Sequence, residues 1–336
     1  MHNLYFIAPY AVEVREEPLP PVGEGQLLVR TDYSAISAGT EMLLYRGQMP
    51  ADLALDETIA ALAGGMQYPV RYGYAAVGTV LDVGKNVDKV WIGRQIFAFY
   101  PHSTHFVVEK TAVFPLPAGI NPADALFLPN METAVSFVMD SQPVIGERVA
   151  IFGQGVVGLL TTAVLATMPL ADLWVVDGVA RRREQALAWG ATAALDPAEA
   201  EALPALRQFA ADLSLELSGN PAALDLAIEA TGFNGRILVG SWYGQKRAEL
   251  NLGGRFHRAH QTLISSQVSQ MKPHWLGRWD KQRRLDVAWR LLAEIRPSQL
   301  ITHRYPLAEA AVAYDLLDRR PHEALQVVFG QDRDGR

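Results

Sequence analysis

A glycine-rich turn between two apolar stretches constrains the fold of this chain more than any other feature. Residues 149–152 read Val-Ala-Ile-Phe, and residues 153–158 read Gly-Gln-Gly-Val-Val-Gly. A second apolar run over 172–176 is followed by Asp177, about 20 residues after the last glycine. A strand, a G-x-G-x-x-G turn, a helix and a second strand that ends in an acid together predict a dinucleotide-binding βαβ unit.

Each position of the turn has a physical role in holding a dinucleotide. Gly153 allows the tight turn, Gly155 lets the backbone approach a pyrophosphate, and Gly158 lets the helix pack closely on the strand. Val156 and Val157 open the helix, whose free N–H groups and positive dipole end attract phosphate. We therefore expect these five residues to bind the cofactor.

Asp177 indicates which dinucleotide binds. A carboxylate at the end of this strand accepts hydrogen bonds from both ribose hydroxyls and disfavours a 2′-phosphate, so NAD is favoured over NADP. Residues 181–183 are three arginines, and a guanidinium such as that of Arg182 offers a site for adenine or a phosphate, which leaves NADP open. The ends of later strands should also line the cofactor site, and they carry Ser218, Gly219, Gly240 and Ser241.

Composition narrows the class of partner. With 336 residues the chain suits two domains, and 49% hydrophobic with 20% charged residues is typical of a globular protein. The net charge of −6 and the lack of a long Lys/Arg run argue against nucleic acid or an anionic membrane and favour a small-molecule substrate. The first residues do not read as a secretory leader and the apolar segments are too short to span a bilayer, so we expect a cytoplasmic location.

The chain shows two patterns of elements. Short apolar runs bounded by Gly, Pro and Asp, such as 26–30 and 76–83, predict a β-rich, barrel-like antiparallel domain in the first third. From about Pro122, helical patterns alternate with apolar strands, which predicts an α/β domain with a doubly wound parallel sheet. The expected strands there are 148–152, 173–176, 212–217, 236–239 and 261–265. The expected helices are 156–168, 180–189, 221–230 and 281–295.

The C-terminal stretch 301–329 reads as strand, helix and strand, and we expect it to return to the first domain. The predicted domains are therefore 1–121 together with 299–336, and 122–298. Between Gln48 and Pro69, apolar residues have partly helical spacing and are bounded by proline and paired glycines. This segment predicts an inserted helix that acts as a lid.

The order of the predicted parts, a β-rich first domain, a nucleotide-binding domain and a C-terminal return, resembles the medium-chain dehydrogenase/reductase superfamily. Three motifs of the first domain support this resemblance. Residues 34–41 with 45–47 are similar to the segment that carries the superfamily's first zinc cysteine, 73–78 to its Gly-His-Glu motif, and 93–97 to the strand that follows. The resemblance extends over nearly the whole chain. It implies a GroES-like catalytic domain joined to a Rossmann domain, and an enzyme that transfers hydride with a nicotinamide cofactor.

The chain departs from the zinc-dependent members of the superfamily at the metal ligands. Ser37 or Ala38 stands where they place cysteine, and Tyr74 and Ala75 stand where they place histidine and glutamate. The chain has no cysteine, which excludes disulfides and a four-cysteine structural zinc site. Because a catalytic zinc needs about three protein ligands, we expect no metal. An unpatterned metal site remains the alternative, and its scattered candidate ligands are Glu41, Glu132, His102 and His105.

The residues around these positions resemble a zinc-lacking branch of the superfamily that includes bacteriochlorophyllide dehydrogenase-like proteins. Segments 36–41, 73–74 and 130–134 carry this resemblance. It implies a zinc-independent oxidoreductase that interconverts an alcohol and a carbonyl on a small organic or biosynthetic intermediate. Reduction of a C=C bond conjugated to a carbonyl, as in enone and quinone reductases, and non-catalytic nucleotide binding remain alternatives.

Without a metal, a hydrogen-bond donor must stabilise the substrate oxygen. Tyr74 is the first candidate because the resemblance puts it where zinc-dependent members have a metal ligand. Its phenol could donate a proton to the substrate oxygen. Alternatively, its ring only fills the volume that the metal would occupy. Thr40 and Ser37 can relay a proton, since a hydroxyl both donates and accepts, or can simply form a turn. His102 and His105 lie in a predicted loop, where a histidine is usually solvated but can carry a proton.

Two acids complete the candidate site. The resemblance puts Thr133 beside the nicotinamide. The neighbouring Glu132 could therefore act as a general base or bind substrate hydroxyls. Alternatively, Glu132 caps a helix that begins near Thr133. Glu41 is expected to tune Tyr74 or to pair with Arg46.

A stretch rich in basic and aromatic residues is the least generic part of the second half. It comprises 255–258, Trp275, Arg278 and Trp279. Such groups hold a planar or anionic substrate, or form a subunit contact, and we expect a homodimer.

Overall fold

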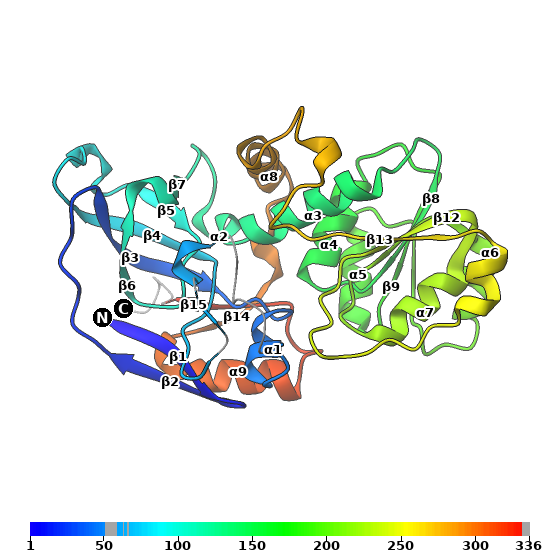
Figure 1. Ribbon diagram of the computed structural model, residues 1–336, viewed down its shortest axis with the longest axis horizontal. Helices are drawn as coiled ribbons and strands as arrows, with labels where there is room; N and C mark the ends of the chain where they lie inside the picture. The colour runs from blue at the N-terminus through cyan, green and yellow to red at the C-terminus, as the bar shows by residue number, and fades with distance from the viewer. Residues whose placement is uncertain (51–58, 63, 66, 331–336) are drawn as a thin grey trace. The chain divides into compact units, whose positions relative to one another are not determined.

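The computed structural model describes residues 1–50, 59–62, 64–65 and 67–330. The chain forms two compact units, whose elements are labelled in Figure 1. Unit 1 comprises Met1–Pro129 and Leu292–Arg336, and unit 2 comprises Asn130–Leu291.

The two divisions fall within continuous helices, α3 (Leu128–Ser141) and α8 (Lys281–Ile295). The sequence pattern instead predicts the divisions at 121/122 and 298/299. An unbroken helix carries the chain from one unit into the next without a Gly- or Pro-rich linker, so no change of composition marks these points.

Unit 1 is built on a mostly antiparallel sheet in the order β14-β15-β3-β4-β5-β7, with β6 also paired to β3. The long strand β3 pairs with β6 through residues 26–30 and with β15 through residues 33–35, while β4 pairs along the same strand. Register shifts in the β3/β4 pairing bend β3, so the sheet curls around an apolar core that includes Leu27 and Phe106. The strands are β1 (His2–Ala8), β2 (Ala11–Glu16), β3 (Gln26–Ala35), β4 (Ala76–Val83), β5 (Gln95–Ala98), β6 (His105–Glu109), β7 (Val113–Pro115), β14 (Ile301–Tyr305) and β15 (Gln326–Gly330).

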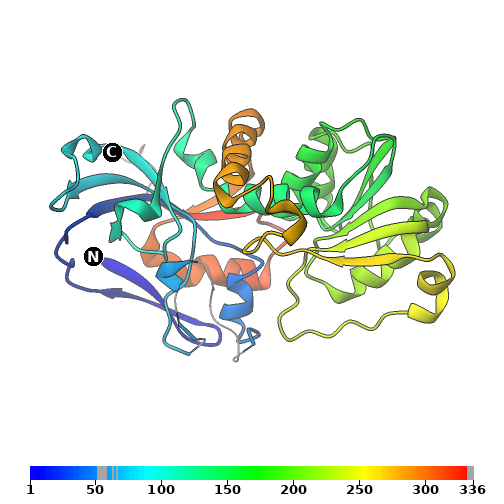
Figure 2. The ribbon, with the colours of Figure 1, turned by 45° about the horizontal axis from the view of Figure 1, so that its top comes forward.

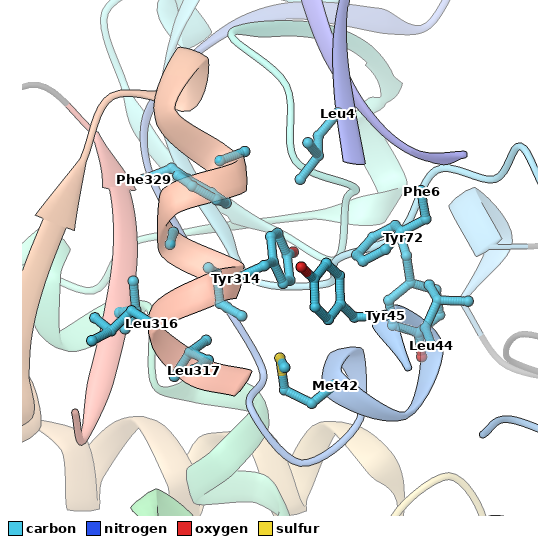
Figure 3. Close-up of a cluster of buried hydrophobic side chains, with 14 of the residues drawn as sticks. Leu4, Phe6, Met42, Leu44, Tyr45, Tyr72, Tyr314, Leu316, Leu317 and Phe329 are labelled. Carbon is cyan, nitrogen blue, oxygen red and sulfur yellow. The ribbon is translucent and has the colours of Figure 1, made fainter. Parts of the chain in front are cut away.

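A second core of unit 1 lies between the β1/β2 hairpin, α1 (Glu41–Tyr45) and α9 (Ala310–Arg319), as Figure 3 shows. The Tyr314 ring of α9 meets Phe6 edge-on with centroids 5.2 Å apart and stacks on Tyr45 of α1 at 5.3 Å. Aromatic side chains bury about 150–250 Å² each, so this cluster ties the short helix α1 firmly to α9. The remaining short helix of unit 1 is α2 (Pro122–Ala125).

The inserted helix predicted between Gln48 and Pro69 falls largely on residues 51–58, 63 and 66, which lie outside the described residues. Within the described part, Ala60–Leu62 forms a single 3-10 turn, and the Leu62 side chain is buried in the second core of unit 1.

Unit 2 is a six-stranded parallel sheet in the order β10-β9-β8-β11-β12-β13. The order reverses between β8 and β11, which makes the carboxyl ends of these two strands the switch point where α/β sheets bind ligands. Contacts group α4 with α5 and α6 with α7, and Figure 2 shows helices on both faces of the sheet. The predicted doubly wound α/β fold is confirmed.

The strands of unit 2 are β8 (Arg148–Phe152), β9 (Asp172–Val176), β10 (Ala193–Leu195), β11 (Ala211–Glu216), β12 (Thr231–Val239) and β13 (Thr262–Ser265). The helices are α4 (Val156–Leu165), α5 (Ala180–Ala188), α6 (Ala202–Phe209) and α7 (Pro221–Ala230). Sequence periodicity misses β10 and α6. The first is a three-residue edge strand without β-branched residues, and the second is short and contains a proline.

None of the helices in the described ranges is both long and apolar enough to cross a membrane.

Candidate functional site

The glycine-rich turn of unit 2 has two glycines that packing requires and one that faces open space. Gly153 has φ +96°, and a Cβ there would lie 2.5 Å from the Ser218 Cα. A Cβ on Gly158 would lie 2.0 Å from the Gly153 carbonyl oxygen, whereas a Cβ on Gly155 would meet nothing within 4 Å. The backbone at Gly155, followed by the first N–H groups of α4 at Val156 and Val157, is therefore the part of the turn open to a pyrophosphate.

Asp177 is fixed beside this turn by backbone donors. Its side chain is buried, and Oδ2 accepts from the Gln154 N–H at 2.7 Å while Oδ1 accepts from the Val179 N–H at 2.8 Å. Arg182 Nη1 lies 3.8 Å from Oδ2. Arg183 instead donates to Asp196 and to the Asp177 carbonyl, so only one of these two arginines faces the Asp177 carboxylate. The position that distinguishes NAD from NADP thus carries both the Asp177 carboxylate, which favours ribose hydroxyls, and the Arg182 guanidinium, which favours a 2′-phosphate.

A buried acid that the sequence analysis missed organises the next two strand ends. Glu216, at the end of β11, accepts from the Ser218 N–H at 2.8 Å, from the Ser218 hydroxyl at 2.5 Å and from the Tyr243 hydroxyl at 2.5 Å. Gly219 N–H donates to Ser241 Oγ at 2.8 Å. Burial and the Glu216 carboxylate raise the pKa of Tyr243, which keeps that phenol a donor. The sequence did offer a signal for this group, because Glu216 is an acid near the end of the predicted strand 212–217.

Gly240 has a packing role, because a Cβ there would lie 2.5 Å from the Phe137 Cζ and 2.6 Å from a Leu217 methyl carbon. In the basic and aromatic stretch, Arg278 lies over Trp275 at 5.4 Å, Arg283 lies over Trp279 at 4.2 Å, and Arg255 Nε donates to the Thr231 carbonyl at 2.9 Å. These contacts show how the residues satisfy each other and do not identify a ligand.

Glu132 forms a buried ion pair. Its Oε1 accepts from Arg284 Nη2 at 2.7 Å and from Nε at 3.1 Å, and both side chains are at most 5% exposed. Arg284 also donates to Ser136 Oγ at 2.9 Å and to the Val268 carbonyl at 2.7 Å. Because this carboxylate is buried and already bonded to a guanidinium, we assign Glu132 a structural role. The expected helix cap is wrong, because α3 begins at Leu128 and both Glu132 and the half-buried Thr133 lie inside it.

Three hydroxyls come together in unit 1. Tyr74 precedes β4, and its phenol donates to Ser37 Oγ; the Tyr74 oxygen lies 3.4 Å from Thr40 Oγ1. Ser37 and Thr40 belong to the turn between β3 and α1, and Thr40 occupies the N-cap position of α1 without using its hydroxyl as a cap. All three side chains are partly exposed. The sequence prediction that placed these residues in one site is consistent with this geometry.

Glu41 and His102 differ from expectation. Glu41 is fully buried and does not pair with Arg46, which instead binds Asp318 at 2.7 Å. His102 is not a solvated loop residue: its ring is fully buried, with Nε2 3.0 Å from Glu41 Oε2. His105 is half-buried, and burial lowers its pKa.

The superfamily's zinc does not fit the donor set. The positions of its ligands hold a hydroxyl or methyl group at Ser37 or Ala38, a phenol at Tyr74 and a methyl group at Ala75, none of which is an ordinary zinc ligand. Among the described residues, no group of three His, Cys, Asp or Glu side chains is arranged to hold a metal ion.

Comparison with known proteins agrees with the two-unit architecture. Residues 156–280 match the family model described as zinc-binding dehydrogenase. D-guloside 3-dehydrogenase of Escherichia coli strain K12 is 21% identical over 350 residues, which covers 97% of this chain and 99% of that protein. The chain is thus similar over nearly its whole length to dehydrogenases of the medium-chain dehydrogenase/reductase superfamily.

Solved structures of dehydrogenases share the fold over almost the whole length. Galactitol-1-phosphate dehydrogenase from Escherichia coli matches with a TM-score of 0.79 and 19% identity, covering 98% of this chain and 100% of that chain. A short chain alcohol dehydrogenase from E. coli CFT073 in complex with NADH matches with a TM-score of 0.78 and 17% identity, covering 98% and 99%. These structures confirm the predicted fold, with a GroES-like unit 1 and a Rossmann unit 2. The family match and the relatives support an oxidoreductase that uses a nicotinamide cofactor.

Proposed function

We propose that this protein is an NAD(H)-linked dehydrogenase that interconverts an alcohol and a carbonyl without a catalytic zinc. The observation that carries the proposal is the Tyr74 phenol, bonded to Ser37 and near Thr40, at positions where zinc-dependent relatives place metal ligands. A polyhydroxylated substrate is the class to test first, because the full-length relative is named for oxidation of a guloside.

In this reaction the two units have separate tasks. When bound, the nicotinamide accepts or supplies the hydride. In unit 2, the backbone around Gly155 binds the pyrophosphate and Asp177 binds the ribose hydroxyls. In unit 1, the Tyr74 O–H turns from Ser37 Oγ to the substrate oxygen when substrate binds, and it gives its proton to the developing alkoxide during reduction. The Ser37 hydroxyl, next to Thr40, then returns a proton to the Tyr74 phenolate and is itself reprotonated from solvent; during oxidation the transfers run in reverse, because each hydroxyl both donates and accepts.

Product analysis tests the proposal. The purified protein is mixed with NAD⁺ and a panel of secondary alcohols, cyclitols and glycosides, and reduced nicotinamide is followed by absorbance while NMR identifies the product. We expect a ketone in place of one hydroxyl. Turnover only with enones, giving a saturated C–C bond, or NADH binding without turnover of alcohols, carbonyls or enones, would overturn the proposal.

We expect the active protein to contain no stoichiometric zinc and to keep its activity in EDTA. The physical reason is the donor set at Ser37, Tyr74 and Ala75, which offers no thiolate, imidazole or carboxylate. Elemental analysis and an activity assay before and after chelation check this, with a zinc-dependent dehydrogenase treated in parallel. About one zinc per chain, lost together with activity, would contradict the expectation.

NADH should bind more tightly than NADPH, and Asp177→Ala should narrow the difference. The variant removes ribose hydrogen bonds to a charged acceptor, which are worth about 1.5–3 kcal/mol, or roughly tenfold to a hundredfold in the NADH dissociation constant. Fluorescence titration of both nucleotides measures the ratio. Arg182→Ala is the matched control, since it removes the opposing charge 3.8 Å away and should weaken NADPH alone. A wild-type preference for NADPH would show that Arg182 dominates.

A further inference from the structure

Among the described residues of unit 1, the Glu41 carboxyl group is fully buried, and three polar groups lie within hydrogen-bond distance of it. Oε1 accepts from the Ser37 N–H at 2.8 Å, and Oε2 accepts from the Tyr314 hydroxyl at 2.5 Å and lies 3.0 Å from His102 Nε2. Glu41, His102 and Tyr314 are each 0% exposed. Burying a carboxylate is costly unless it is hydrogen-bonded, so this network has a fixed geometry and little freedom to rearrange.

His102 supports the segment that carries Tyr74. Its ring lies directly under Gly73, where an added Cβ would be 2.8 Å from the imidazole Cδ2, and its backbone N–H donates to the Tyr72 carbonyl at 3.2 Å. Gly73 has φ +120°, so both the conformation and the close approach require glycine there. On its other side the imidazole Nδ1 lies 2.8 Å from Ser34 Oγ. His102 therefore packs directly against the backbone of the segment 72–74 that carries Tyr74.

The two partners of the Tyr74–Ser37 hydrogen bond are thus held by the two members of one buried pair. Glu41 fixes the Ser37 backbone, and His102 fixes the backbone one residue before Tyr74. We propose that the Glu41–His102 pair is a positioning device that sets the Tyr74 hydroxyl against Ser37 and Thr40. The proposal rests on the proposed function only in that Tyr74 is taken as the proton donor.

The core of unit 1 keeps this pair in place. Figure 3 shows Tyr314 reaching from α9 toward Tyr45 of α1, within the aromatic cluster that also contains Phe6 and Phe329. Burial first, and then the neighbouring Glu41 charge, raise the pKa of Tyr314 well above its ordinary value, so this phenol stays a neutral donor. Glu41 Oε2, which also lies beside His102 Nε2, therefore accepts from a phenol that stays protonated under working conditions.

Substitution of His102 tests the proposal through turnover. His102→Leu removes both the bond to Glu41 and the planar ring under Gly73, and we expect kcat to fall about 10²-fold, the loss that a misplacement of about 1 Å can cause. KM should stay near wild type, because the lost geometry matters in the transition state. His102→Gln keeps a donor for Glu41 and should recover part of kcat. This variant also decides the question if His102→Leu does not fold.

Tyr314→Phe is the matched control. It removes a hydrogen bond to Glu41 Oε2 and keeps its ring in the core, while Glu41 Oε1 keeps the bond from the Ser37 N–H and His102 keeps its contacts with Gly73 and Tyr72. It should lower Tm while leaving kcat within a few-fold of wild type. Equal losses of kcat in Tyr314→Phe and the His102 variants at matched losses of Tm would show a general stability effect and overturn the proposal.

A readout that does not need turnover separates this inference from the proposed function. With 3-fluorotyrosine incorporated at position 74, fluorine NMR reports the environment and titration of that phenol. We expect the signal and its titration midpoint to move in His102→Gln and to stay unchanged in Tyr314→Phe. An unmoved signal in a folded His102 variant overturns the positioning role, whatever the enzyme's activity. A moved signal in a protein whose wild type turns over no alcohol or carbonyl overturns the proposed function instead.

Discussion

Tyr74→Phe should lower kcat by about 10²–10³ and change Tm little. Removing one donor aimed at a developing oxyanion costs about that factor in other enzymes. The ring and its edge-on contact with Tyr72, at 6.1 Å between centroids, are retained. The Ser37 hydroxyl that loses its partner is only half-buried, so water can solvate it and stability should fall by no more than about 1 kcal/mol. Steady-state kinetics with the substrate found in the alcohol panel, and thermal melting, measure both.

Tyr68→Phe controls for the loss of a phenol as such. The Tyr68 hydroxyl, also in unit 1, donates to the Leu44 carbonyl at 2.5 Å and not to Ser37 or Thr40. This variant should lose some stability and no kcat. If Tyr74→Phe instead keeps full kcat, Tyr74 only fills space, and Thr40 or Ser37 becomes the first donor to test.

Arg284→Leu should lower the free energy of unfolding by about 3–5 kcal/mol. Breaking a buried pair leaves an uncompensated charge, here Glu132, whose side chain is 5% exposed. The change also takes donors from Ser136 Oγ and from the Val268 carbonyl. Urea unfolding followed by tryptophan fluorescence measures the loss.

Two further variants show whether the loss comes from the buried charge. Glu132→Leu combined with Arg284→Leu removes both charges and should be less destabilised than Arg284→Leu alone. Arg319→Leu breaks the ion pair with Asp315 on the surface of α9, where Arg319 is 75% exposed, and should change stability by no more than about 0.5 kcal/mol. A loss below about 1 kcal/mol in Arg284→Leu would contradict the role we assign to this pair.

The cofactor half of the candidate site could be predicted from the sequence because it is local. Gly153, Gly155, Gly158 and Asp177 lie within one βαβ unit, and their spacing by itself implies the turn, the helix start and the acid at the next strand end. The alternation of apolar strands and helices likewise predicts the parallel sheet, apart from the short elements β10 and α6. The three unit 1 hydroxyls were found through a family resemblance at separate motifs.

What only the tertiary structure decided is which buried groups meet. Glu132 and Arg284 are 152 positions apart, Glu41 and His102 are 61 apart, and Glu41 and Tyr314 are 273 apart. Periodicity and spacing describe neighbours along one element, and for Glu41 the sequence offered only two alternatives, an influence on Tyr74 or a pair with Arg46. A buried charge instead takes whichever donors the packing of distant elements brings within reach, since leaving it unpaired costs more than any local preference supplies.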